Sequence, residues 1–316
     1  DHRGCNEGLR IDPCRDQGGK DQCCRKDDAP PELYPPDYQE YMEEVQAPDL
    51  PPVRLACRVA HLGDRFFGSQ MQAAERTVEG EFVAACIRLG LFADHRQAGF
   101  TAAGRTDRGV HARGQIFAFS TSYPSRALSA LNWQLPLDCW ISGYGKVGER
   151  FNPRYDAKWR TYRYYFGTPY LDQKAMDSAA RLFVGTHDFS VFSRTSGRNP
   201  ERSITSARVW CEGGMCIFEV TGDSFLWNMV RLMAASLMRI GLRDEGEEGI
   251  MLRLEGERLS PLSPLPPDGL ILWEVNCGIA FTPLPVEGKR QAFLERLHEH
   301  HTALERVVRD LKEGNR

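Results

Sequence analysis

The sequence lacks a long uninterrupted apolar segment. Its most apolar run, residues 224–241, is interrupted by Asn228, Arg231 and Arg239 and is too short to span a bilayer comfortably. We therefore expect no membrane segment. Because the chain begins at Asp1 and not at Met, we expect a processed or truncated N-terminus.

The sequence also lacks the paired Cys-x-x-Cys spacing that is typical of zinc sites. Four of the ten cysteines lie in the first 52 residues, where a metal or iron–sulfur role has to be weighed but is not favoured: Cys5, Cys14, Cys23 and Cys24. The other six lie in strand-like or helix-like apolar contexts: Cys57, Cys86, Cys139, Cys211, Cys216 and Cys277. A free buried thiol is the usual state in such contexts, which predicts a reducing, cytoplasmic setting and no metal.

A strong net charge is absent as well. The formal net charge of −3 gives no reason by itself to expect a nucleic-acid partner. Residues 1–52 carry −7, however, and the rest of the chain carries +4. Within that rest, residues 101–163 carry +6, so this segment is a candidate for contact with a phosphate backbone.

What the chain does contain is the composition of a soluble globular protein. Its 41% hydrophobic and 26% charged residues exclude fibrous and wholly disordered classes. A length of 316 residues predicts two subdomains. We predict an acidic, cysteine-bearing arm at 1–52, a first subdomain at 53–150, a second at 151–285 and a C-terminal helix at 286–316.

Strand-like and helix-like segments alternate from residue 53 onward, which predicts an α+β fold with antiparallel neighbouring strands. The predicted strands are 53–60, 99–104, 114–122, 139–147, 160–167, 203–210, 215–221 and 269–277. The predicted helices are 77–90, 125–136 capped by Ser125, 172–185 starting at Asp172, 224–241, and a last segment from about 287. In that last segment, apolar residues and one histidine recur at helical spacing: Phe293, Leu297, His300, Leu304, Val308 and Leu311.

An unusual turn, AGRTDRGVHA at 103–112, places Asp107 between Arg105 and Arg108 and between two glycines. One interpretation is a surface loop with a local ion pair. The other is a reactive carboxylate that is kept ionised in a turn built for close backbone approach. The turn alone does not decide between them.

Arg231 is the second unusual position, because it lies inside an apolar helical segment. Its guanidinium must either reach solvent or find an acid. Asp107 is an available partner, and we expect an arginine beside it to lower its pKa and hold it as an anion.

Tyr162 is the third, in the segment FNPRYDAKWRTYRYYF at 151–166. Tyr162, Tyr164 and Phe166 share one face of a strand, which is typical of a core strand with charged residues outward. An aromatic strand with interleaved arginines also suits a flipped base and its phosphates. Spacing leaves both interpretations open.

Several motifs together resemble the TruA family of tRNA pseudouridine synthases. They are AGRTDRGVHARGQIFAF, FNPRYDAKWRTYRYYF, LFVGTHDFSVF, GDSFLWNMVRLM, HLGDRFFGSQMQ and PPDGLILWEV. They occur in the order of the family and cover about residues 53–285. The resemblance implies that Asp107 is the catalytic nucleophile, that Tyr162 stacks on the target uracil and handles a proton, and that Arg231 pairs with Asp107.

The resemblance and the basic charge together suggest four RNA-binding residues: Arg105, Arg108, Arg160 and Leu270. Of these, Arg105 matches the family's nucleotide-extruding arginine and Leu270 an apolar wall of the uracil pocket. The family's fold is a mixed, mostly antiparallel sheet flanked by helices, in two similar subdomains with the active-site cleft between them.

The implied activity is isomerisation of uridine to pseudouridine in the tRNA anticodon stem-loop, at tRNA positions 38–40 or a subset. The reaction changes no redox state, so we expect neither a metal nor an organic or nucleotide cofactor. A base inside a stem is unreachable, which requires base flipping onto an aromatic platform. The family also implies a homodimer, and we expect a cytoplasmic tRNA-modifying enzyme.

Three departures from the family pattern bear on this interpretation. The arm at 1–52 and the C-terminal helix match no segment of the family, and each is a candidate for oligomer contacts or for tRNA positioning. Arg108 and the FLWNMVR stretch are similar to archaeal forms, which leaves the choice of uridine open. Ser69 replaces an aromatic residue, and we expect it to weaken packing in the first loop. The rival interpretations are a tRNA-binding chaperone of the same fold without turnover, and an RNA-modifying enzyme that uses the N-terminal cysteines.

Overall fold

A computed structural model describes residues 51–168, 170–194, 199–257 and 259–313. The strands are β1 (Val53–His61), β2 (Thr101–Ala102), β3 (His111–Thr121), β4 (Cys139–Val147), β5 (Trp159–Phe166), β6 (Gly185–Asp188), β7 (Glu201–Glu212), β8 (Met215–Gly222), β9 (Leu270–Asn276) and β10 (Thr282–Pro283). The helices are α2 (Val78–Arg88), α3 (Pro124–Gln134), α4 (Pro153–Asp156), α5 (Gln173–Arg181), α6 (Met229–Gly241), α7 (Glu248–Leu254) and α8 (Gly288–Glu313), with 3-10 turns η1 (Ser190–Phe192) and η2 (Pro267–Gly269).

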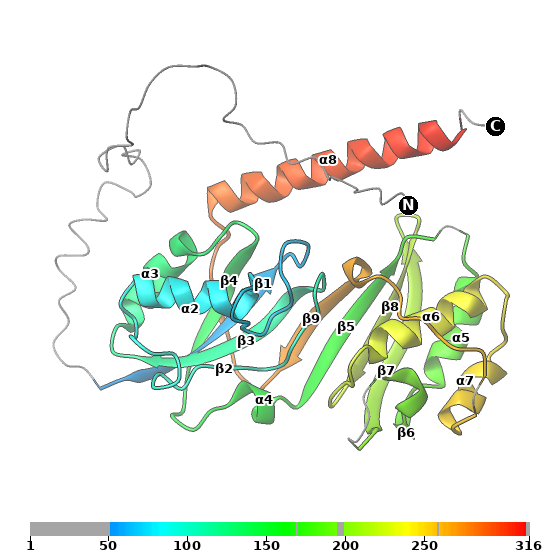
Figure 1. The fold of residues 1–316 in the computed structure, drawn as a ribbon, viewed down its shortest axis with the longest axis horizontal. Coiled ribbons are helices and arrows are strands. Elements are labelled where there is room, and N and C mark those ends of the chain that lie inside the picture. The colour runs from blue at the N-terminus through cyan, green and yellow to red at the C-terminus, as the bar shows by residue number, and fades with distance from the viewer. Residues whose placement is uncertain (1–50, 169, 195–198, 258, 314–316) are drawn as a thin grey trace, which may run out of the picture. The chain divides into compact units, whose positions relative to one another are not determined.

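One sheet joins all the described strands in the order β10-β4-β1-β3-β9-β5-β8-β7-β6, with β2 on β3. Among the described residues every strand pair is antiparallel except β3 with β9. In Figure 1, α2 and α3 lie at the β1 and β4 end of the sheet, and α5, α6 and α7 lie at the β7 and β8 end. The predicted fold class is confirmed. The arm at 1–52 falls almost entirely outside the described residues, and the division into two subdomains stays a prediction.

The spacing of apolar residues along the sequence explains why most of these helices and strands form. Tyr164 and Phe166 of β5 are buried in the core beneath α5 and α6, and Tyr162 packs against the same cluster. Helix α2 is capped by Thr77, whose hydroxyl accepts from the amide of Gly80 at 3.2 Å. The ring of Phe82 on its buried face meets aromatic rings of β3, as the apolar stripe requires.

Two helices begin elsewhere than predicted. Helix α3 starts at Pro124, one residue before the predicted cap Ser125, because proline at the first position already has a helical φ. Helix α6 starts at Met229 and not at residue 224. The residue before it, Asn228, has a left-handed backbone with φ of 62°, which ends the apolar loop and turns the chain into the helix.

The prediction of free thiols is wrong for two cysteines. Cys211 and Cys216 face each other across the β7–β8 hairpin and form a disulfide, with a Cα separation of 4.0 Å. The turn between them contains Gly213 and Gly214, both at positive φ, which brings the two strand ends into register. Cys57, Cys86, Cys139 and Cys277 are free thiols, as predicted.

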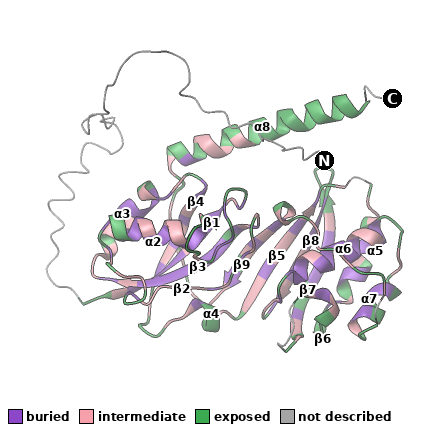
Figure 2. Cartoon of the chain, viewed as in Figure 1, coloured by how far each residue is buried: buried purple, intermediate pink, exposed green. Residues whose placement is uncertain are grey.

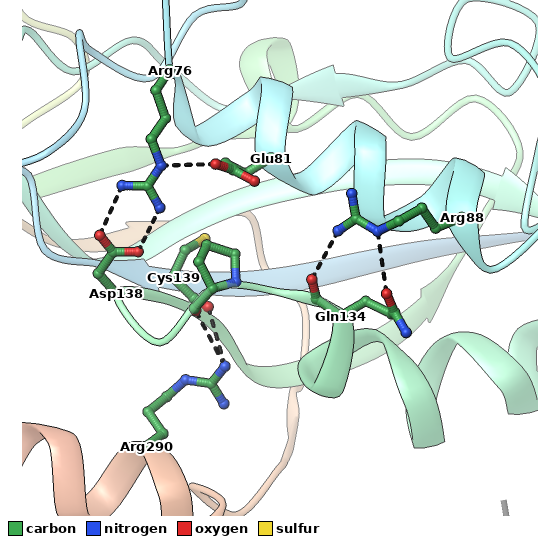
Figure 3. Close-up of polar contacts among 8 residues, drawn as sticks. Arg76, Glu81, Arg88, Gln134, Asp138, Cys139 and Arg290 are labelled. Carbon is green, nitrogen blue, oxygen red and sulfur yellow. Dashed lines mark hydrogen bonds and ion pairs between the residues drawn. The ribbon is translucent and has the colours of Figure 1, made fainter. Parts of the chain in front are cut away.

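Polar contacts fasten the first half of the sheet to its helices (Figure 3). Arg76 donates to both carboxylate oxygens of Asp138 at 2.9 Å and to Glu81 at 2.8 Å. Arg290, at the start of α8, is 1% exposed and donates to the backbone oxygen of Asn132. It also donates to the backbone oxygen of Cys139, as Figure 3 shows. These contacts fix α2 and the base of α8 on β4.

None of the described helices combines the length and the apolar character that a bilayer crossing requires. In the same residues, no group of three or more His, Cys, Asp or Glu side chains is placed to hold a metal ion. The cysteines of the arm lie outside the described residues.

Candidate active site

Asp107 lies in the loop between β2 and β3, and a second loop holds this one in place. The amide of Thr106 donates to Ser69 Oγ at 2.8 Å, and the amide of Ser69 donates back to the Thr106 carbonyl at 3.0 Å. Ser69 is fully buried. The structure shows no sign of the expected weakening, because Ser69 gives the Thr106 amide an acceptor that a phenylalanine or tryptophan side chain would lack.

One glycine of the loop and one glycine beside it permit close backbone approach. Gly109 has φ of +82°, and a Cβ on it would lie 2.8 Å from Pro267 Cγ. A Cβ on Gly63 would lie 2.4 Å from the carbonyl oxygen of Val110. The structure accounts for both glycines by contacts within the chain, which press the Asp107 loop against η2 and the end of β1.

Arg231 projects from the first turn of α6 toward Asp107. Its Nη1 lies 4.0 Å from Asp107 Oδ2, with the arginine side chain 15% and the aspartate side chain 37% exposed. Arg231 also donates from Nε to the carbonyl of Leu265 at 2.5 Å and from Nη1 to Asn228 Oδ1 at 3.0 Å. The guanidinium is thus held in one orientation, and the two most unusual residues of the sequence meet in space.

The net direction of the Asp107 pKa differs from the expectation. Burial raises the pKa of Asp107, and this effect outweighs the nearby charge of Arg231 and a hydrogen bond from the Trp227 indole, both of which lower it. The expectation of a lowered pKa is wrong because it counted the arginine and not the desolvation. Arg231 and Trp227 therefore act to keep a carboxylate ionised in a site that opposes its charge.

Tyr162 on β5 lies in the same region. Its ring meets Phe225 edge to face with centroids 5.0 Å apart. Burial raises the pKa of the Tyr162 phenol to about 12, and the charge of Asp107 acts in the same direction. The phenol is therefore protonated at neutral pH and is suited to donate a hydrogen bond.

The four predicted RNA-binding residues take different positions. Arg105 and Arg108 are exposed, and the guanidinium of Arg108 lies over the Phe67 ring at 4.1 Å. Arg160 donates to the carbonyls of Ala103, Arg154 and Asp223. Leu270 is 6% exposed and belongs to the core.

Arg160 therefore ties β5 to the base of the Asp107 loop, and Arg105 and Arg108 are the members of this set that remain open to solvent.

Sequence reasoning missed three residues of this site. Asn228 holds the guanidinium of Arg231, and its left-handed φ suits asparagine, which is enriched there. Trp227 is 56% exposed beside Asp107, an unusual place for the largest aromatic side chain. Gln115 is fully buried and donates to the carbonyl of Gly104 at 2.9 Å, and no local signal marks it.

Comparisons with known proteins agree with these motifs. A family model described as tRNA pseudouridine synthase matches residues 179–276. The chain is 50% identical over 265 residues to tRNA pseudouridine synthase A of Methanoculleus marisnigri, covering 84% of this chain and 97% of that protein. It is 46% identical over 256 residues to the protein of the same name from Methanosphaerula palustris, covering 81% of this chain and 91% of that one.

A more distant relative of the same name, from Thermococcus onnurineus, is 39% identical over 250 residues, covering 78% of this chain and 92% of that protein. Among solved structures, a Cbf5-Nop10-Gar1 complex aligns with a TM-score of 0.28 and 12% identity, over 58% of this chain and 54% of that one. A likeness at this level supports no argument. The sequence relatives carry the assignment.

Proposed function

The chain belongs to the TruA family of tRNA pseudouridine synthases, which are isomerases, and from that premise we propose that it modifies the tRNA anticodon stem-loop with Asp107 as the nucleophile. The proposed targets are the uridines at tRNA positions 38–40 or a subset of them. The observation that carries the proposal is the approach of Arg231 to Asp107 at 4.0 Å, with Tyr162 in the same region.

The reaction explains why these residue types are needed. The bond from N1 of uracil to C1′ of the ribose breaks, the base rotates, and a bond from C5 to C1′ forms. The C5 proton is released and N1 takes up a proton, so the product is an isomer of the substrate. A carboxylate opens this sequence by adding either to the uracil ring or to the sugar, and both paths require Asp107 as an anion.

The neighbours of Asp107 divide the remaining tasks. Arg231 and Trp227 keep the carboxylate charged and oriented. Tyr162 offers an aromatic face and a protonated hydroxyl to an extruded uracil. Arg105 and Arg108 are exposed beside the acid, where they neutralise the phosphates of the target nucleotide and its neighbour. Arg160 supports the loop, and Leu270 forms an apolar wall behind the base.

Three further properties belong to the same proposal. We place the active-site cleft between subdomains at 53–150 and 151–285, because Asp107 and Arg231 come from opposite sides of that division. We propose a homodimer and a cytoplasmic location. A single mass equal to one chain, measured by light scattering at working concentration, would contradict the dimer and leave the chemistry intact.

The test is release of tritium from an unmodified tRNA transcript that carries the label at C5 of uracil. We expect release by the wild-type chain and none by Asp107→Asn, with tRNA affinity largely unchanged. Transcripts that retain only one uridine within positions 38–40 then identify the targets. Tight binding by the wild type without release would favour a tRNA-folding chaperone, and equal release by Asp107→Asn would refute the nucleophile.

A further inference from the structure

Among the described residues, helix α8 is buried against the body at its first turns. Arg290 is buried at its base, where it pairs with Glu287 at 3.0 Å. Beyond Leu297, every residue from His298 to Glu313 is exposed, and Figure 2 draws this part of α8 almost wholly in the colour of exposed residues. Within the part of the chain that the structure describes, no side chain of the last four turns of α8 is buried against the body, and an isolated helix is marginal in water.

The exposed part carries an apolar stripe in a seven-residue repeat. Leu297, Leu304 and Leu311 occupy one position of the repeat, and Phe293, His300 and Val307 occupy the position four residues before each leucine, so the stripe is apolar except for one histidine. Leu304 is 45%, Val307 52% and Leu311 66% exposed. Such a stripe is the pattern of a helix that packs against another helix.

The charge of α8 favours a protein partner over RNA. The helix contains six Lys or Arg and five Asp or Glu residues, so it has almost no net charge. A surface that binds nucleic acid neutralises several phosphates and needs a clear positive excess. The partner must instead offer an apolar stripe of matching length, and a second copy of this chain supplies one.

We propose that α8 pairs in an antiparallel coiled coil with α8 of a second copy. In this arrangement Leu297 lies opposite Val307 of the partner subunit, Leu304 opposite His300 of the partner subunit, and Leu311 opposite Phe293 of the partner subunit. Arg296 flanks the stripe at one end and Asp310 at the other, seven residues either side of Ala303. Antiparallel pairing therefore brings Arg296 of each chain to Asp310 of the other, whereas in a parallel, in-register pair each of these residues lies level with its own copy. Asp310 also pairs with Arg306 of its own helix at 2.9 Å.

The surface around the base of α8 extends this interface. Trp133 of α3 is 40% exposed and lies 5.6 Å from Lys289 Nζ, and Leu137 nearby is also 40% exposed. In the antiparallel arrangement the C-terminal turn of the partner's helix reaches this region and covers both side chains. This interface rests on the proposed homodimer. A dimer that persists when the α8 contact is lost would refute the α8 interface and leave the homodimer itself intact.

The first experiment is sedimentation equilibrium of the full-length chain and of Leu304→Asp and Val307→Asp. Burying an aspartate at the centre of such a seam weakens association about 100-fold or more, so we expect the variants to have half the wild-type mass. Thr302→Asp is the matched control, because it adds the same charge to the opposite face of α8, and its mass should equal that of the wild type. Circular dichroism establishes that each variant is folded.

The second experiment tests the direction of pairing. Arg296→Asp places like charges opposite each other and should weaken association, Asp310→Arg should do the same, and the double variant should restore it. A monomeric wild type, an unchanged mass in Leu304→Asp, or a double variant that stays weak would each overturn the proposal. So would an unchanged mass with a tenfold loss of tRNA affinity, which would assign α8 to RNA contact.

Discussion

Asn228 should control catalysis through Arg231 without touching Asp107. Its Oδ1 accepts from Arg231 Nη1 at 3.0 Å, and it is 9% exposed, so water does not readily replace it. A hydrogen bond to a charged group contributes about 1.5–3 kcal/mol. Because Arg231 keeps its second bond to the Leu265 carbonyl, we take the lower end of that range, which corresponds to about a tenfold loss of kcat.

Three substitutions at this position separate the bond from the backbone. Asn228→Gly removes the acceptor and keeps the left-handed conformation, so kcat should fall about tenfold with little change in KM. Asn228→Ala removes the same acceptor and adds a left-handed alanine, which costs about 1–2 kcal/mol of stability in addition. Asn228→Asp keeps an oxygen but adds an anion that competes for Arg231 and raises the pKa of Asp107, so the acid limb of the pH–rate profile should move to higher pH.

The assay is the initial rate of tritium release on an unmodified transcript, with urea denaturation of each variant as the stability measurement. A double-mutant cycle with Arg231→Met gives the decisive comparison, because Asn228→Gly should have no further effect once Arg231 is gone. Wild-type kcat in Asn228→Gly, or additive losses in the double variant, would refute the reasoning.

The remaining predictions concern stability. Ser69→Ala leaves the buried amide of Thr106 without its side-chain acceptor, so we expect a loss of about 1–3 kcal/mol in urea and a lower kcat, with Ser69→Thr as the control. Burial lowers the pKa of His61 from 6.5 to about 4, so the unfolded chain takes up the proton first as the pH falls. The free energy of unfolding should therefore decrease by up to about 3 kcal/mol as the pH falls from 6.5 to about 4. In His61→Gln this decrease should be smaller. Glu245→Gln leaves the 1% exposed guanidinium of Arg253 without its carboxylate and should lower the free energy of unfolding by about 3–5 kcal/mol. Replacing both residues by apolar ones should lower it clearly less. Equal losses for the two variants in chemical denaturation would contradict this prediction.

The spacing of apolar residues predicted those helices and strands that bury one face in the hydrophobic core. The β5 alternation of Tyr162, Tyr164 and Phe166 is an example, since a strand with one buried face leaves a pattern of period two. The start of α6 could not be found in this way. Leu226 is buried although it lies in a loop, and apolar residues in a buried loop look the same in the sequence as the first turn of a helix.

The disulfide was missed for a different reason. Its cysteines were judged by their apolar context, whereas the informative feature is register. Cys211 and Cys216 flank a turn with two glycines, and a short hairpin turn places residues at these positions directly opposite each other.

The approach of Arg231 to Asp107 could be predicted from the sequence, but the electrostatics around the pair could not. The sequence placed one unusual acid and one unusual arginine in the chain, and a buried cation requires a partner, so their meeting followed from elementary chemistry. The net direction of the Asp107 pKa did not follow, because it depends on how much surrounding protein excludes water from the carboxylate. That quantity arises only when elements distant in sequence pack together.

The junction between β3 and β9 joins the part of the sheet next to Asp107 to the part next to Arg231. Its strand pairing consists of two residue pairs, His111 with Ile271 and Ala112 with Leu272. His111 adds a bridge, because its Nδ1 accepts from the amide of Gly63 at 3.0 Å and its Nε2 is then left to donate to the carbonyl of Asp268 at 3.1 Å. A Cβ on Gly114 would lie 2.7 Å from the Trp273 carbonyl oxygen, so the two strands approach as closely as glycine allows.

This short junction lies between the elements that hold Asp107 and Arg231. Asp107 is fastened on the β3 side by Ser69 and Gln115, and Arg231 is fastened on the β9 side through Leu265. Neither side alone provides both the acid and the cation that favours its ionised form. The pair of Asp107 and Arg231 is therefore assembled where the two halves of the sheet meet, and buried polar side chains and closely packed glycines hold the loops at that place.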